Sequence, residues 1–310
     1  MGPRPRITAP SVRSRKVSSG HPPLVMVTAY DAPGARMADE AGVDLLLVGD
    51  SGAMVVLGYD DTLKVTVDDI AHHTAAVART APRALVVADL PWLSYHLSVE
   101  DTVRNGASLV RAGASAVKLE GGAKRVPMVT ALVAAEIPVM GHLGLTPQSV
   151  HAMGGFKVQG KEAGAARTLV EDASALVDAG VFAIVLEGVP DVVARMVTDA
   201  VPVPTIGIGA GGHCDGQVLV LHDVLGLEDR IAPKFVRRYA SLKADGTAAL
   251  AAFADDVRSG AFPDDTETYH LAPEVALELG LEPEVAQVGG PASDGSSDVG
   301  RLYGGATMSA

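Results

Sequence analysis

The chain has 310 residues, a formal net charge of −12 and one cysteine, with 48% hydrophobic and 20% charged residues. The negative charge argues against a nucleic-acid-binding protein, because phosphate backbones select basic surfaces. The single Cys214 excludes an intrachain disulfide and a cysteine-rich zinc site. No apolar run approaches the roughly 20 residues of a membrane helix, so we expect a protein that does not bind membranes and works in the reduced cytoplasm.

Residues 1–22 are basic, with five Lys or Arg residues, no acidic residue and no apolar periodicity. This composition predicts a disordered basic tail. A transit-like segment has the same composition and is the alternative.

One pattern repeats after this tail: an apolar, β-branched run ends in a polar or Gly-rich turn, and an Ala-rich amphipathic stretch follows. Near-continuous apolar runs are typical of strands buried on both faces. The runs are 24–31, 44–50, 84–92, 116–122, 138–144, 183–189, 204–211 and 217–226. The stretches between them often end in a glycine that suits a left-handed helix C-cap, as in 40–44, 111–115 and 178–182.

This alternation of strands and helices predicts a parallel sheet joined by right-handed crossovers. About eight units favour a closed (β/α)₈ TIM barrel, an α/β fold, as one catalytic domain over residues 23–272. A flavodoxin-like or Rossmann sheet is the alternative, but no GxGxxG motif follows the first strand. Residues 273–310 are predicted to be a mostly disordered extension with a short helix around Pro273–Leu279.

Polar residues at the ends of the predicted strands are the candidate site, because the carboxyl ends of barrel strands form the active face. They are Asp31, Asp50, Ser51, Asp89, Lys118, Glu120, His142, Glu187, His222 and Asp223. Converging carboxylates repel one another unless a cation or protons neutralise them. Oxygen ligands without cysteine favour Mg²⁺, with Mn²⁺ or Co²⁺ as substitutes. The alternative is that single residues of this set cap helices.

Lys118 and Glu120 are two residues apart on one strand, so both side chains face the barrel interior. Lys118 suits a substrate carboxylate or a Schiff base, and the alternative is a buried ion pair. Glu187 ends an apolar run and is a candidate general base, or else it bonds to a loop amide. His142 could be a metal ligand, a hydrogen-bond donor to substrate or a structural histidine.

Two further motifs are less specific. His72 and His73 lie on a predicted helix and are interpreted as structural. The glycine cluster at 207–212 is either a phosphate cradle or a close approach of the backbone to a ligand.

Several long segments together resemble the ketopantoate hydroxymethyltransferase family, over roughly residues 12–270 and in the same order. They are TAYD (28–31), VGDS (48–51), TVDDIAHHTAAV (66–77), ADLPW (88–92), AGASAVKLEGG (112–122), GHLGLTPQS (141–149), GGFKVQGK (154–161), IGIGAG (206–211), DGQVLVLHD (215–223) and PKF (233–235). The segment beyond about residue 272 has no counterpart in the shorter members.

The resemblance implies a (β/α)₈ barrel that transfers a hydroxymethyl group from 5,10-methylenetetrahydrofolate to 3-methyl-2-oxobutanoate. The product would be 2-dehydropantoate, for pantothenate and coenzyme A synthesis, and the intermediate a Mg²⁺-stabilised enolate. It also implies a homo-oligomer, commonly a decamer. Lys157 and Lys161 could meet the glutamate tail of the folate, or they are simply solvated.

The resemblance also implies roles for particular residues. The metal would be bound by Asp50 and Asp89 with Glu120 close by, the 2-oxo acid by Asp50, Ser51, Asp89 and Lys118, and the substrate proton by Glu187. A Mg²⁺-dependent 2-oxo acid lyase or mutase of the phosphoenolpyruvate mutase and isocitrate lyase type is the alternative function. A non-catalytic scaffold is a second alternative, and it predicts the loss of at least one of these acids.

Overall fold

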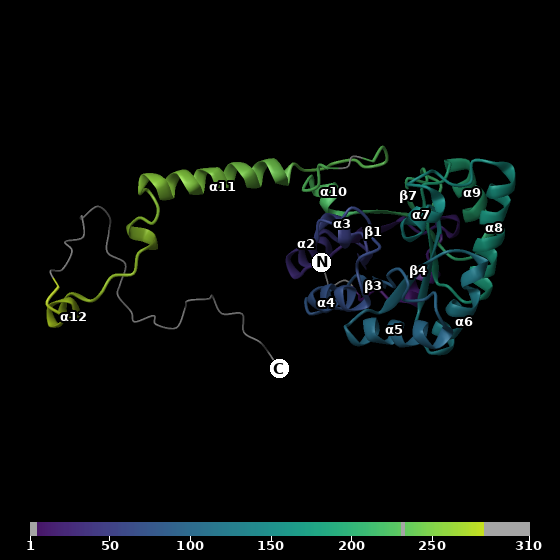
Figure 1. Cartoon of the computed structure of the whole chain (residues 1–310), viewed down its shortest axis with the longest axis horizontal. Coiled ribbons are helices and arrows are strands. Elements are labelled where there is room, and N and C mark those ends of the chain that lie inside the picture. The colour runs from purple at the N-terminus through teal and green to yellow at the C-terminus, as the bar shows by residue number, and fades with distance from the viewer. Residues whose placement is uncertain (1–4, 231–232, 282–310) are drawn as a thin grey trace. The chain divides into compact units, whose positions relative to one another are not determined.

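The apolar runs form parallel strands that pair in chain order and close into a barrel, as a computed structural model of residues 5–230 and 233–281 shows (Figure 1). The predicted (β/α)₈ barrel is therefore confirmed, and each strand lies within or at the edge of its predicted run. The strands are β1 (Leu24–Thr28), β2 (Leu45–Val48), β3 (Leu85–Asp89), β4 (Ala116–Glu120), β5 (Val139–Gly144), β6 (Ala183–Glu187), β7 (Thr205–Ile208) and β8 (Gly216–Leu219).

The strands are apolar throughout because both of their faces are covered. In β2 all four residues are buried. Leu46 and Val48 pack in the outer cluster, between the sheet and the helices. Leu45 and Leu47 belong to the inner cluster, inside the barrel. The two-residue period of a strand divides one apolar run between two cores.

Helices follow most strands and lie around the barrel, where Figure 1 labels α4, α5, α6 and α8. The glycines expected at helix ends have positive φ values: 86° at Gly42, 112° at Gly113 and 105° at Gly180. The α-helices of the described residues are α1 (Ala9–Arg13), α2 (Ala32–Ala41), α3 (Gly52–Val55), α4 (Val67–Ala78), α5 (Val99–Arg111), α6 (Val126–Ala134), α7 (Val150–Met153), α8 (Ala163–Asp178), α9 (Asp191–Ala200), α10 (Leu221–Leu225), α11 (Leu242–Ser259) and α12 (Pro273–Glu278).

The last predicted strand run contains two elements. Strand β8 ends at Leu219, and α10 begins at Leu221, whose backbone N–H donates to the Thr28 hydroxyl at 2.9 Å. His222 and Asp223 therefore lie on a helix rather than at a strand end. An apolar run alone does not separate a buried strand from a short buried helix.

The N-terminal segment departs from the predicted disordered tail. Helix α1 has a Thr8 capping box, and its Val12 is fully buried in the inner cluster. Arg13 Nη1 donates to the Val181 carbonyl at 2.7 Å, and Lys16 Nζ lies 3.0 Å from Asp215 Oδ2. The segment closes the N-terminal ends of the strands. A five-residue helix has no readable period, and its basic residues pair with partners far away in the sequence.

The chain divides into two compact units, and the first ends at Ala248, earlier than the predicted boundary at residue 272. The second unit contains α12, which matches the short helix expected around Pro273–Leu279. The predicted disorder of the last residues falls on 282–310, outside the described residues. Among the described helices, none is both long and apolar enough to cross a bilayer.

Candidate active site

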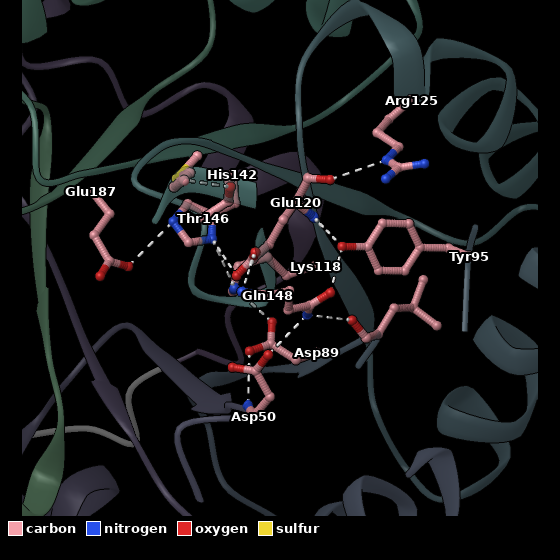
Figure 2. A network of polar contacts seen from close by, with 12 residues as sticks. Asp50, Asp89, Tyr95, Lys118, Glu120, Arg125, His142, Thr146, Gln148 and Glu187 are labelled. Atoms are coloured by element: carbon pink, nitrogen blue, oxygen red, sulfur yellow. Dashed lines mark hydrogen bonds and ion pairs between the residues drawn. The ribbon is translucent and has the colours of Figure 1, made fainter. Parts of the chain in front are cut away.

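A cavity of about 840 Å³ lies at the carboxyl ends of the strands. Eight of the ten candidate residues line it, whereas Asp31 and His222 do not. The eight are Asp50, Ser51, Asp89, Lys118, Glu120, His142, Glu187 and Asp223. Figure 2 shows these residues except Ser51 and Asp223, at or just beyond the ends of β2, β3, β4, β5 and β6.

Asp89 is the centre of the polar network at the ends of β2, β3 and β4. Its Oδ1 is 2.7 Å from Lys118 Nζ, and its Oδ2 accepts the Asp50 backbone N–H at 3.0 Å. Asp89 and Lys118 are register partners on neighbouring strands, so the fold itself brings them together. All three residues are buried.

These buried charges do not cancel. Burial raises the pKa of Asp50 well above its ordinary value, and the charges of Asp89 and Glu120 raise it further. Burial also raises the pKa of Asp89, although Lys118 opposes the shift. Burial would lower the pKa of Lys118, but the surrounding carboxylates outweigh it and raise that pKa. Lys118 is therefore an ammonium ion, which suits a carboxylate partner, whereas a Schiff base requires the neutral amine.

The carboxylates fit a hard divalent cation. Among the described residues, no group of three or more His, Cys, Asp and Glu side chains is arranged as a metal cage. Mg²⁺ does not need one, because it is usually bound through one or two carboxylates and keeps its remaining positions for water and substrate. Asp50 and Asp89 offer such a pair of oxygen donors in a negatively charged cavity.

His142 lies between two carboxylates. Its Nδ1 is 3.3 Å from Glu120 Oε1, and its Nε2 is 3.3 Å from Glu187 Oε2. Burial and the charge of Lys118 lower the pKa of His142, but the contacts with Glu120 and Glu187 prevail and raise it to about 9. Its Nε2 is buried and makes no hydrogen bond, so the contact with Glu187 is an ion-pair contact only, and the three predicted roles of His142 stay open.

Some polar residues near the strand ends are structural. Asp31 Oδ1 accepts from the Gly34 backbone N–H at 2.7 Å and caps α2, so the helix-cap alternative holds for this residue. His73 lies on α4, as expected, with Nδ1 2.8 Å from the Tyr30 carbonyl. The Tyr30 hydroxyl in turn bonds to Ser51 Oγ at 2.9 Å.

Two residues of the network were not singled out from the sequence. Gln148 Nε2 donates to Asp50 Oδ2 at 2.8 Å, and the Tyr95 hydroxyl donates to Gln148 Oε1 at 2.6 Å. Gln148 lies in the GHLGLTPQS segment. Because it is an uncharged amide four residues beyond a strand end, the sequence pattern does not predict which carboxylate it contacts.

The remaining lining of the cavity is mainly apolar. Phe156, Val158 and Phe235 line it together with Lys157. Both phenyl rings are exposed. Lys161 does not line the cavity.

The glycine cluster at 207–212 packs closely against side chains. A Cβ on Gly209, whose φ is +62°, would lie 2.7 Å from the Phe235 ring. A Cβ on Gly211 would lie 2.4 Å from Asp191 Cβ. The backbone of this cluster therefore lies close to side chains that line the cavity, while the two predicted interpretations, a phosphate cradle or a close approach to a ligand, stay predictions.

Comparison with known sequences gives long matches. A sequence model of the family described as ketopantoate hydroxymethyltransferase matches residues 6–265. The 3-methyl-2-oxobutanoate hydroxymethyltransferase of Syntrophobacter fumaroxidans is 56% identical over 279 residues, covering 89% of this chain and 98% of that protein. The protein of the same name from Moorella thermoacetica is 56% identical over 270 residues, covering 87% and 100%.

Solved structures share the fold at low sequence identity. A 2,3-dimethylmalate lyase of the phosphoenolpyruvate mutase and isocitrate lyase superfamily gives a TM-score of 0.53 with 19% identity, covering 89% of this chain and 95% of that chain. A phosphonopyruvate hydrolase in complex with oxalate and Mg²⁺ gives 0.55 with 15% identity, covering 88% and 95%. At these identities the likeness concerns the barrel fold alone, so it does not favour lyase or mutase chemistry.

Proposed function

The chain belongs to the ketopantoate hydroxymethyltransferase family, and we propose how its cavity carries out the transfer of a hydroxymethyl group to 3-methyl-2-oxobutanoate. The activity itself, 3-methyl-2-oxobutanoate hydroxymethyltransferase of pantothenate biosynthesis, follows from the close relatives. The observation that carries the proposed mechanism is the convergence of Asp50, Asp89, Lys118 and Glu187 on one cavity.

Asp50 and Asp89 would hold a Mg²⁺ ion, with Glu120 close by. Such a cation polarises a keto group and makes the adjacent carbon acidic. Lys118 forms an ion pair with Asp89. Its positive charge would stabilise the substrate carboxylate or the keto oxygen, which becomes negative in the enolate. Ser51, held by Tyr30, is a second polar contact for the oxo acid.

Glu187 is the group that removes the proton from C3 of the oxo acid. It ends β6, lines the cavity and has its Oε2 3.3 Å from His142 Nε2. Water hydrolyses both carbon–nitrogen bonds of the methylene bridge in 5,10-methylenetetrahydrofolate, which gives tetrahydrofolate two N–H bonds and leaves the one-carbon unit as formaldehyde. The carbanion, delocalised as an enolate, attacks the carbon of this aldehyde, and the resulting alkoxide takes up the proton that Glu187 removed to become the hydroxyl group. The products are 2-dehydropantoate and tetrahydrofolate.

The apolar part of the cavity suits the folate, which brings a flat aromatic ring system and an anionic tail. Phe156 and Phe235 offer aromatic surfaces for stacking. Lys157 lies on the same segment as Phe156 and offers a cation to the tail. We therefore assign the acidic lining of the cavity to the oxo acid and the aromatic lining to the folate. The homo-oligomer implied by the resemblance stays a prediction, for light scattering to test.

The mechanism is tested by following the C3 proton of 3-methyl-2-oxobutanoate by NMR in deuterated water, with and without Mg²⁺, before the folate is added. We expect exchange that requires Mg²⁺, then 2-dehydropantoate that requires the folate. Equal exchange with and without Mg²⁺ would contradict the cation site. The absence of exchange under both conditions would contradict an enolising mechanism as a whole.

A further inference from the structure

Gln148 contacts residues at or just beyond the ends of β2, β3 and β4, each of which carries a carboxylate there. Gln148 itself is uncharged and does not line the cavity. It lies on the 3₁₀ helix η3 (Pro147–Ser149), which follows β5, and it is buried. Its backbone N–H donates to Glu120 Oε2 at 3.1 Å, and its Nε2 donates to Asp50 Oδ2 at 2.8 Å and to the Leu90 carbonyl at 3.0 Å. Leu90 directly follows Asp89 in the sequence.

The orientation of the Gln148 amide is fixed by its neighbours. The Tyr95 hydroxyl accepts the Glu120 backbone N–H at 3.2 Å, and it donates its single hydrogen to Gln148 Oε1 at 2.6 Å. If the amide were flipped, its oxygen would face the Asp50 carboxylate and the Leu90 carbonyl, and both of these are acceptors. Nε2 must therefore point to Asp50, as Figure 2 shows.

We propose that Gln148 is a positioning residue for the cation site, which holds the Asp50 carboxylate and the backbone beside Asp89 in the arrangement that a divalent cation requires. This inference rests on the proposed function, which assigns the cation to Asp50 and Asp89. Gln148 acts through these residues and does not itself contact the cation or the substrates. The amide occupies one acceptor position of Asp50 Oδ2, so the carboxylate keeps further acceptor positions for a cation.

A neutral amide suits this task better than a charged donor. A lysine or arginine at this position would neutralise Asp50 and compete with the cation for it. The amide fixes the carboxylate and leaves its negative charge in place. Both amide hydrogens are used, one on Asp50 and one on Leu90, so neither is directed at the cation.

The test is the affinity of the full chain for Mn²⁺, used as a paramagnetic substitute for Mg²⁺ and measured without substrates by electron paramagnetic resonance. The Gln148→Met variant keeps a side chain of similar length and the backbone bond to Glu120, but it loses the amide. We expect its Mn²⁺ affinity to fall by about 10- to 100-fold, as is typical when a partner of a metal ligand is removed. Tyr95→Phe frees the amide without removing it, and we expect a smaller loss of affinity.

Thr198→Val is the matched control. Its hydroxyl is buried and bonded to Thr205 Oγ at 2.7 Å, near the opposite end of the barrel. This variant also loses a buried hydrogen bond, so it reports the effect of reduced stability alone, and its Mn²⁺ affinity should equal that of the unmodified chain.

The outcomes distinguish a failure of the proposed cation site from a failure of the positioning role of Gln148. If the unmodified chain does not bind Mn²⁺, the cation site of the proposed function is wrong. If it does bind, and Gln148→Met keeps its affinity within about twofold, the positioning role is wrong, because partners of metal ligands have larger effects. If circular dichroism shows that Gln148→Met does not fold, Tyr95→Phe decides, and an unchanged affinity in that variant overturns the proposal.

Discussion

At the scale of single residues, the site combines buried carboxylates whose pKa values are raised, Asp50 and Asp89, with a single ammonium ion, Lys118. Asp89 holds the Lys118 ammonium on one oxygen and the Asp50 backbone N–H on the other. Each of these contacts stabilises the ionised carboxylate, while burial opposes it. A further cation at this point would stabilise the ionised carboxylates in the same way.

The first prediction concerns Asp89. Asp89→Asn removes the charge and leaves Lys118 without its closest partner, so we expect no measurable Mg²⁺-dependent binding of 3-methyl-2-oxobutanoate in isothermal titration calorimetry. Asp31→Ala is the control, since Asp31 is also an aspartate just beyond a strand but caps a helix. It should lower the free energy of unfolding by about 0.5–2 kcal/mol and keep binding. Unchanged binding in Asp89→Asn would exclude Asp89 as a ligand.

The second prediction separates binding from proton transfer. Glu187→Gln keeps the size of the side chain and still offers an amide group to His142, so the oxo acid and Mg²⁺ should bind as before. Exchange of the C3 proton with deuterated water should fall by about 10²- to 10⁴-fold, the usual contribution of a positioned general base. The measurement is the NMR exchange rate at saturating oxo acid. Exchange at the rate of the unmodified chain would identify another residue as the base.

At the scale of elements, the strand ends explain why the site residues could be found from the sequence. A carboxylate that closes an apolar run, such as Asp89 or Glu120, must lie where a barrel strand leaves the sheet, and all such ends meet at one mouth. Gln148 and Phe235 lie on connecting segments instead, where no periodicity constrains the position of a side chain. Their contacts depend on the tertiary path of the chain, so a strand-and-helix pattern could not reveal them.

The third prediction concerns the segment after β7 and its contact with Phe235. Gly209→Ala places a methyl group 2.7 Å from the Phe235 ring at a backbone φ of +62°, so the ring must move. Phe235→Ala removes the ring altogether. If this ring stacks on the folate, both variants should raise KM for 5,10-methylenetetrahydrofolate, by about 5- to 10-fold for a lost aromatic contact. Initial-rate kinetics with each substrate varied in turn should show little change in KM for the oxo acid, and an equal rise for both substrates would contradict the division of the cavity.

At the scale of the whole barrel, the two ends have different tasks. At the carboxyl ends of the strands the carboxylates outnumber the nearby cations. At the amino ends the carboxylates are paired with basic residues of the segment that follows α1. Lys16 Nζ bonds to the Thr198 carbonyl at 2.8 Å and to Asp215 Oδ2 at 3.0 Å. Composition alone made this segment look like a tail, because its partners Thr198 and Asp215 are almost 200 residues away along the chain.

The last prediction tests this division. Lys16→Met leaves Asp215 buried without its cation, and breaking a buried ion pair costs about 3–5 kcal/mol. Asp215 keeps hydrogen bonds from the Val17 and Thr205 backbone N–H groups, so we expect the lower end of that range in the free energy of unfolding measured with urea. Mn²⁺ affinity should be unchanged, whereas Asp89→Asn should abolish Mn²⁺ binding. A Lys16→Met chain as stable as the unmodified one would show that the Lys16–Asp215 ion pair does not stabilise the barrel, and weaker Mn²⁺ binding in it would show that the two ends are coupled.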